Sequence, residues 1–184
     1  TIYVTPSRLP AETQRAIADV AARAAAALGL REGPCHAEVR VNDRGAWMVE
    51  IAGRSIGGLC SRTLRFGTDM SLEELILRQT FGMEIESAER EKGAGGVMMI
   101  PIPTAGTLLG VDGVKEAESV EGIESVEITA KVNYVIKPLP EGDSYLGFIF
   151  ARGETPDEVE AALREALGKL RFEIEEELSV LPIR

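Results

Sequence analysis

The chain has 184 residues, of which 45% are hydrophobic and 27% charged, a balance that provides for a packed core and argues against disorder. Its formal net charge of −10 is uneven, because residues 1–94 hold 13 acids and 12 bases whereas residues 95–184 hold 17 acids and 8 bases. The acidic second half excludes nucleic acid as the expected partner. The lack of a long apolar run likewise excludes a membrane, so the chain is expected to be cytoplasmic.

The first half is predicted to begin with a strand-like run at residues 2–4 and an alanine-rich helix over residues 11–28. The helix is predicted because its apolar residues recur at helical spacing and Gly29 is placed to end it. Two strands are expected next, at roughly 35–42 and 46–52.

A glycine-bearing loop at residues 53–58 follows these strands. Ser71 and Glu74 then have the spacing of a capping box, in which the serine hydroxyl and the glutamate carboxylate each accept from an unpaired backbone amide. This spacing predicts a helix that runs to about residue 81.

A linker is predicted at residues 91–96, which are polar and then glycine-rich and coincide with the change in charge. The expected domains are therefore residues 1–94 and 95–184. The second is expected to contain strands near 96–103, 106–111, 123–130 and 145–152, with a short helix near 113–118.

A second capping box, Thr155 to Glu158 with Pro156 at the first helical position, predicts another helix. The acidic run at residues 173–177 is expected to be a solvated helix end. Antiparallel strands followed by a helix indicate an α+β fold class. Cys35 and Cys60 fit no metal-binding spacing and are expected to be free thiols.

The two strands at 35–42 and 46–52 carry the residues of greatest chemical interest. A three-residue turn at residues 43–45 would pair Asn42 with Ala46 and Arg40 with Met48. Glu38 would then lie directly opposite Glu50, on the face that His36 also shares. Trp47 is expected on the apolar face of the hairpin.

Opposed carboxylates repel each other, by up to about 1 kcal/mol on a solvated surface. A divalent cation between them would turn this repulsion into attraction, and Mg²⁺ binds through one or two carboxylates together with phosphate oxygens and water. Two alternatives remain open. The pair could share a proton for acid–base chemistry, or it could be a solvated face relieved by Arg40 or Arg54.

Glu38, Glu50 and Arg54, followed by a loop with Gly57 and Gly58, resemble the metal-binding end of the ATP-grasp carboxylate–amine ligases. The L-amino-acid ligase branch is the most similar, and the helix after the loop and the region from residue 95 to about 174 resemble it as well. The resemblance implies the C-terminal part of an ATP-grasp subdomain, an antiparallel sheet with helices, followed by a small α+β domain.

The same resemblance implies the roles of individual residues. Glu38 and Glu50 would hold the Mg²⁺ ions, with Mn²⁺ as an alternative, that bridge the phosphates of ATP. Arg54 would contact the transferred phosphate and the acyl-phosphate intermediate near the backbone amide of Gly57. His36 and Arg62 are candidates for binding substrate. One position departs from the pattern, since the metal-binding asparagine of the family is Ala52 here.

The resemblance also implies a C-terminal fragment of an enzyme that joins an amino acid or another carboxylate to an amine. The fragment is expected to lack the lysine-bearing nucleotide subdomain and to be inactive alone, and its partner would be the missing N-terminal part. The rival hypotheses are a degenerate ATP-grasp module that acts only in binding, an oligomerisation domain such as a homodimer would use, and a metal-dependent hydrolase.

Overall fold

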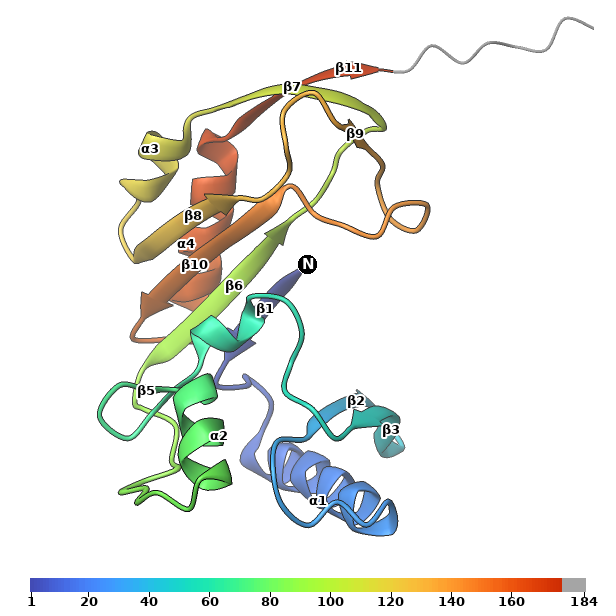
Figure 1. Cartoon of the computed structure of the whole chain (residues 1–184), viewed down its shortest axis with the longest axis vertical. Helices are drawn as coiled ribbons and strands as arrows, with labels where there is room; N and C mark the ends of the chain where they lie inside the picture. Colours follow the sequence, from blue (N-terminus) through green and yellow to red (C-terminus); the bar gives the residue numbers. More distant parts are fainter. Residues whose placement is uncertain (177–184) are drawn as a thin grey trace, which may run out of the picture. The chain divides into compact units, whose positions relative to one another are not determined.

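The computed structural model describes residues 1–176 and divides into two compact units (Figure 1). One unit joins Thr1–Thr5 to the residues from Gly93 onward, and the other is Pro6–Lys92. Both combine antiparallel strands with helices, so the α+β class is confirmed. The assignment of residues 1–94 and 95–184 to two functional domains stays a prediction. No helix of the described part has the length and apolar character of a membrane span.

As far as residue 176, the unit that contains Gly93 is built on two antiparallel sheets with two helices. The order of the larger sheet is β1-β6-β10-β8 and that of the smaller one is β11-β7-β9. The elements are β1 (Ile2–Thr5), β6 (Ala94–Ile100), β7 (Gly106–Asp112), α3 (Val114–Glu118), β8 (Ile123–Ile128), β9 (Val135–Ile136), β10 (Gly147–Gly153), α4 (Pro156–Lys169) and β11 (Arg171–Glu176).

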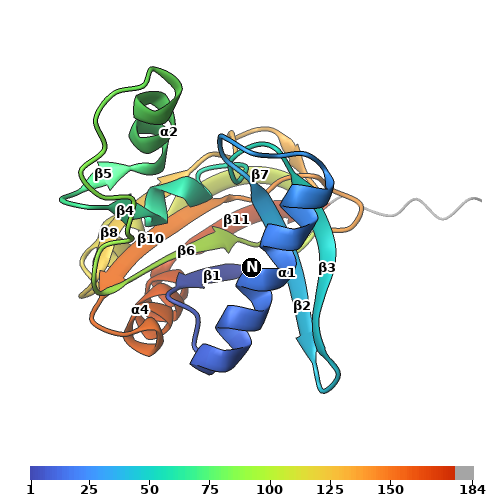
Figure 2. The same ribbon diagram turned by 90° about the horizontal axis from the view of Figure 1, so that it is seen from below.

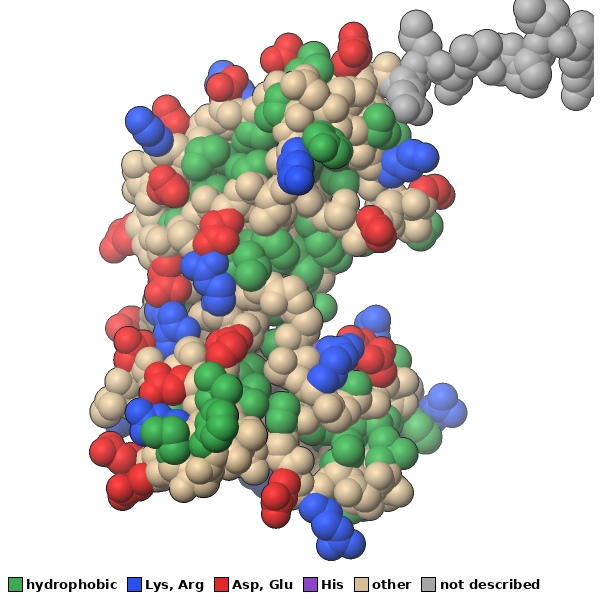
Figure 3. Space-filling model, in the orientation of Figure 1, with side chains coloured by type: hydrophobic (Ala, Val, Ile, Leu, Met, Phe, Trp, Pro, Cys, Tyr) green, Lys and Arg blue, Asp and Glu red, His purple; other side chains and the backbone are tan. Residues whose placement is uncertain are grey.

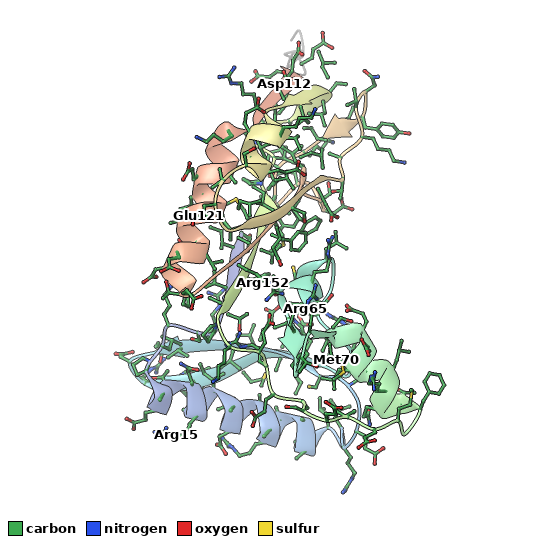
Figure 4. All side chains as sticks on the ribbon, turned by 90° about the vertical axis from the view of Figure 1, so that its left-hand side faces the viewer. Arg15, Arg65, Met70, Asp112, Glu121 and Arg152 are labelled. Atoms are coloured by element: carbon green, nitrogen blue, oxygen red, sulfur yellow. The ribbon has the colours of Figure 1, made fainter. Side chains whose placement is uncertain are left out.

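The main hydrophobic core lies where α4 packs on β6 and β10 (Figure 4). All seven residues of β6 are buried, Met98 and Met99 among them. Helix and strand approach closely at Gly96, where an added Cβ would lie 2.5 Å from Cγ1 of Val159. A larger residue at this position would therefore push the helix away from the sheet.

The ends of α4 show one confirmed prediction and one that was wrong. The capping box is present, because the Thr155 side chain accepts from the Glu158 amide and the Glu158 side chain accepts from the Thr155 amide. Beyond the helix, residues 173–176 belong to strand β11 and not to a helix end; Glu177 lies outside the described residues. Phe172 and Ile174 are half-buried while the acidic residues between and after them are exposed, an alternation that is typical of a strand.

The unit Pro6–Lys92 consists of smaller elements with little fully buried surface. Its elements are α1 (Ala11–Ala27), β2 (His36–Asn42), β3 (Gly45–Ala52), the 3₁₀ helix η1 (Cys60–Thr63), β4 (Arg65–Phe66), β5 (Met70–Ser71) and α2 (Leu72–Thr80). Helix α1 runs along the β2–β3 hairpin, mainly against β3 (Figure 2), and Arg15 projects from its outer side (Figure 4).

Within Pro6–Lys92, the fully buried residues are at η1. They are Cys60 and Ser61. Apolar side chains remain exposed at α2 and just after it, including Leu77, Phe81 and Met83 (Figure 3).

The first turn of helix α2 is capped locally and contacts η1. Ser71 caps the helix by accepting from the Glu74 amide at 3.1 Å. The Glu74 carboxylate accepts from Nε of Arg78 at 2.8 Å, so the reciprocal half of the predicted capping box was wrong. Glu73 instead makes the tertiary contact, since a hydrogen bond from the Ser61 hydroxyl is the main cause that lowers the pKa of its carboxyl group.

Replacing Leu163 by alanine should lower the free energy of unfolding by about 2–5 kcal/mol, because the side chain is fully buried in the α4 interface and its loss leaves a cavity. Chemical denaturation followed by circular dichroism measures the change. Leu139→Ala in the same unit, where the leucine is 53% exposed, should change the free energy by less than about 0.5 kcal/mol. Equal effects of the two substitutions would contradict this core.

Ser61→Ala should raise the pKa of Glu73, because it removes the hydrogen bond that most favours the ionised carboxylate. Because the pKa of Glu73 is lower in the folded than in the unfolded chain, its ionised carboxylate stabilises the fold at neutral pH. This stabilisation is lost as the pH falls from the ordinary glutamate pKa through the lowered pKa of the folded chain. The variant should therefore lose less stability over that acidic range. Carbon-13 NMR titration of Glu73 measures the shift, and an unchanged pKa would refute the Ser61 contact.

Candidate functional site

The β2–β3 hairpin places Glu38 directly opposite Glu50, which confirms the predicted pairing. The route to this register differs from the prediction. Asn42 pairs with Gly45 and Arg40 with Trp47, so the three-residue loop and the pairings of Asn42 with Ala46 and of Arg40 with Met48 were wrong. The Oδ1 atom of Asn42 accepts from the backbone amide of Arg44 and from Nε1 of Trp47, which stabilises the tighter turn.

A register shift beside the carboxylates restores their pairing. It lies between Glu38 and Val39, where Val39 pairs with Met48 and Val49 is left as the extra residue of β3. Such a bulge changes which side chains share a face. Trp47 is consequently 52% exposed, and its expected packing on the apolar face was wrong.

Both carboxylates are accessible and each has a cationic or ionisable neighbour. Their side chains are 53% (Glu38) and 52% (Glu50) exposed. Oε1 of Glu38 lies 3.3 Å from Nε2 of His36, and Oε1 of Glu50 lies 3.4 Å from Nη2 of Arg54. Among the described residues, no three His, Cys, Asp or Glu side chains already converge on a point where a metal ion would fit.

His36 and Ala52 form the next cross-strand pair beyond the two glutamates. Residues two apart on a strand share a face, so these four positions form one patch, which we call the carboxylate patch: His36, Glu38, Glu50 and Ala52. The histidine side chain is only 19% exposed, which restricts the positions of its ring beside Glu38.

Arg54 is the second residue of the glycine-bearing loop that follows β3. Its backbone amide donates to the Ala52 carbonyl at 2.9 Å, and Nη1 donates to the Ser55 carbonyl at 3.0 Å. Further along the loop, a Cβ added at Gly57 would meet nothing within 4 Å, so its backbone is open to approach. Gly58 has a φ of 63°, a backbone conformation that residues other than glycine rarely adopt.

The loop leads into η1, which holds Cys60 and Arg62. Burial raises the pKa of the Cys60 thiol, so this group is a protonated, inert thiol at neutral pH. Both cysteines are free, Cys35 exposed and Cys60 buried, as expected. Arg62 is half-buried on η1 and is not part of the carboxylate patch; its role toward substrate stays a prediction.

Ser61 and Glu73 are the residues of this region that sequence reasoning missed. The Ser61 hydroxyl is the main cause that lowers the pKa of the Glu73 carboxyl group, at the place where η1 contacts α2. The capping spacing at Ser71 predicted the start of the helix. No local pattern identifies Ser61, twelve residues before Glu73, as the partner of that glutamate.

Comparison with known proteins gives two family matches and a set of solved structures. Residues 1–63 match the model of the ATP-grasp domain, and residues 98–175 match that of the L-amino acid ligase C-terminal domain 2. No curated protein matches the sequence significantly.

The solved structures extend over nearly the whole chain. L-amino acid ligase from Bacillus licheniformis is 27% identical with a TM-score of 0.81, covering 95% of this chain and 44% of its own. Phosphoribosylglycinamide synthetase from Anaerococcus prevotii is 15% identical with a TM-score of 0.76, covering 95% of this chain and 45% of its own.

A third match is the biotin carboxylase domain of Hydrogenobacter thermophilus 2-oxoglutarate carboxylase, in complex with MgADP and bicarbonate. It is 16% identical with a TM-score of 0.65 and covers 94% of this chain and 39% of its own. This chain thus spans less than half of the length of each of the three. Residues 1–63 are thus a segment of an ATP-grasp domain and residues 98–175 a C-terminal domain of the L-amino acid ligase type, and the ligase structure supports this assignment.

Proposed function

We propose that the protein is an ATP-dependent carboxylate–amine ligase, or the C-terminal part of one, in which Glu38 and Glu50 hold the Mg²⁺ that accompanies the nucleotide. The observation that carries the proposal is the direct cross-strand pairing of these glutamates. The pair lies inside the residues that match the ATP-grasp domain, and a domain of the L-amino acid ligase type follows it in the chain.

The donor atoms of the hairpin suit Mg²⁺. This ion is bound through one or two carboxylates while phosphate and water oxygens complete its octahedral shell. Two half-exposed carboxylates on opposed residues supply the protein share of such a shell. Binding requires Glu50 to release Arg54, an exposed ion pair that contributes little stability, so the rearrangement has a low cost.

Bound there, Mg²⁺ would neutralise the β- and γ-phosphates of ATP. Arg54, released from Glu50, would present its planar guanidinium group to the transferred phosphate, which it can bind with two parallel hydrogen bonds. The open backbone at Gly57 would allow the phosphate to approach the loop. The buried Cys60 thiol is unsuited to attack, which agrees with a transfer that depends on positioning and charge stabilisation.

The reaction that follows from these roles has two steps. A substrate carboxylate oxygen would attack the γ-phosphorus and form an acyl phosphate as ADP departs. An amine would then attack the acyl carbon, forming an amide or peptide bond and releasing phosphate. We infer amino acids or related carboxylates and amines as substrates because the ligase-type match covers residues 98–175, and His36 and Arg62 remain the candidate substrate contacts.

One observation favours a second candidate, a degenerate ATP-grasp module that binds without catalysis. Ala52 stands where the family pattern has a metal-binding asparagine, and a methyl group cannot coordinate a cation. This candidate shares the fold and predicts nucleotide or metabolite binding without turnover.

Amino-acid-stimulated ADP release by the full-length protein with ATP and Mg²⁺ should be abolished by Glu50→Gln. The substitution removes one of the two proposed anionic ligands. Removing one group that stabilises charge in a transition state typically lowers turnover by about 10²–10³-fold or more. A coupled assay of ADP with pooled amino acids measures the rate.

The matched control is Glu12→Gln, which removes an exposed carboxylate from the first turn of α1 and should leave the rate within about twofold. Equal turnover of Glu50→Gln and the wild type would overturn the assignment of Glu50. Nucleotide binding by the wild type without any stimulated turnover would favour the degenerate module.

A further inference from the structure

A pocket of about 410 Å³ lies within the unit Pro6–Lys92. It is lined by residues 31–34, which connect α1 to β2, and by residues of α2 and of the segment that follows this helix. None of these residues belongs to the carboxylate patch. The volume falls near the lower end of the range of about 300–1,000 Å³ that is usual for small-molecule sites, so the pocket suits a small ligand.

The lining that α2 contributes is mainly apolar. Leu72, Leu75 and Ile76 are half-buried and line the pocket, and their spacing of three and four residues places them on one face of the helix. Ile85, beyond the end of the helix, is half-buried in the same lining. An apolar group of a ligand that enters the pocket would therefore cover apolar surface that is still partly open to water, which favours binding.

Arg31 and Glu32 are the charged residues of the lining, and both are exposed. Within residues 1–176, neither side chain has a partner for a hydrogen bond or an ion pair. A guanidinium group binds a carboxylate through two parallel hydrogen bonds, and a carboxylate accepts hydrogen bonds from an ammonium group. One cation and one anion thus remain available beside an apolar surface.

The two charged residues follow each other in the sequence, which limits the ligands that can use both. Their Cα atoms are about 3.8 Å apart across the peptide bond, so a small ligand that contacts both must carry its opposite charges close together. An α-amino acid meets this condition, because its ammonium and carboxylate groups are attached to one carbon atom. A simple carboxylic acid would use Arg31 but bring a second negative charge near Glu32.

We propose that this pocket binds a free α-amino acid with an apolar side chain, such as leucine. Arg31 binds its carboxylate, Glu32 binds its ammonium group, and its side chain packs on the apolar lining from α2. The inference goes beyond the proposed function, because the pocket contains none of the residues assigned to Mg²⁺ or ATP. Binding at this site therefore requires neither nucleotide nor metal.

The test titrates the full-length protein with leucine in the absence of nucleotide and metal. Calorimetry gives the dissociation constant, and methyl NMR of protein labelled with carbon-13 at isoleucine locates the ligand. Nuclear Overhauser effects are expected from unlabelled leucine to the δ1 methyl groups of Ile76 and Ile85. The substitutions Ile76→Val and Ile85→Val each remove one of these methyl groups and so assign its signal.

Two analogues of leucine test the recognition of both charges. 4-Methylpentanoate lacks the amino group, and 3-methylbutylamine lacks the carboxylate. Each should bind at least about tenfold more weakly than leucine, because a hydrogen bond to a charged group contributes about a factor of ten or more in affinity.

Variants of the two charged residues should separate the analogues. Arg31→Ala should weaken leucine binding by about tenfold without weakening the binding of 3-methylbutylamine. Glu32→Gln should weaken leucine binding to a similar extent without weakening the binding of 4-methylpentanoate. The matched control is Arg15→Ala, which removes an exposed arginine from the outer side of α1 (Figure 4) and should leave the affinity for leucine within about twofold.

Three results would overturn the inference. They are leucine binding without any effect at the methyl groups of Ile76 and Ile85, an affinity for leucine that neither Arg31→Ala nor Glu32→Gln changes, and binding of 4-methylpentanoate or of the dipeptide Leu-Leu as tight as that of leucine. Each of these results leaves the proposed function standing. Conversely, loss of the proposed role of Glu50 in the ADP assay leaves this pocket unaffected.

Discussion

Like charges on directly opposed strand residues repel each other, and Glu38 and Glu50 occupy such positions on the β2–β3 hairpin. In this structure Arg54 lies 3.4 Å from Glu50 and offsets its charge, and the His36 ring lies 3.3 Å from Glu38. These contacts are partly exposed and therefore weak. Under the proposed function, a divalent cation would replace these two weak contacts by one strong centre, and the like-charged pair would serve to hold it.

The surrounding structure keeps this pair in register. Helix α1 packs along the hairpin, the tight turn at Asn42 closes it, and the bulge at Val49 returns the glutamates to the same face. The loop after β3 leads into η1, where Cys60 and Ser61 are buried and which contacts α2. The glycine-bearing loop thus lies between the hairpin and a buried segment while its backbone at Gly57 stays open.

The sequence predicted the features that depend on local periodicity and failed where tertiary packing decides. The helix at Thr155 follows from its capping box. The opposition of Glu38 and Glu50 was predicted through a three-residue turn that the structure does not have, and it depends on the bulge at Val49. The bulge at Val49 was not predictable from the sequence. The position of a β-bulge depends on the twist of the hairpin and on its packing against α1, which local residue types do not show. Strand β11 was missed although Phe172 and Ile174 alternate with polar residues, because the run of acids was interpreted as a helix end.

The most direct test of this account is the position of the metal in a crystal of the full-length protein with Mn²⁺ and ADP, located by anomalous scattering. The account predicts a manganese peak at coordination distance from Glu38, Glu50 and the nucleotide phosphates, with Arg54 released from Glu50. Bound nucleotide with its metal held by other residues, and with Glu50 still paired to Arg54, would contradict the central claim that the opposed glutamates are the cation site.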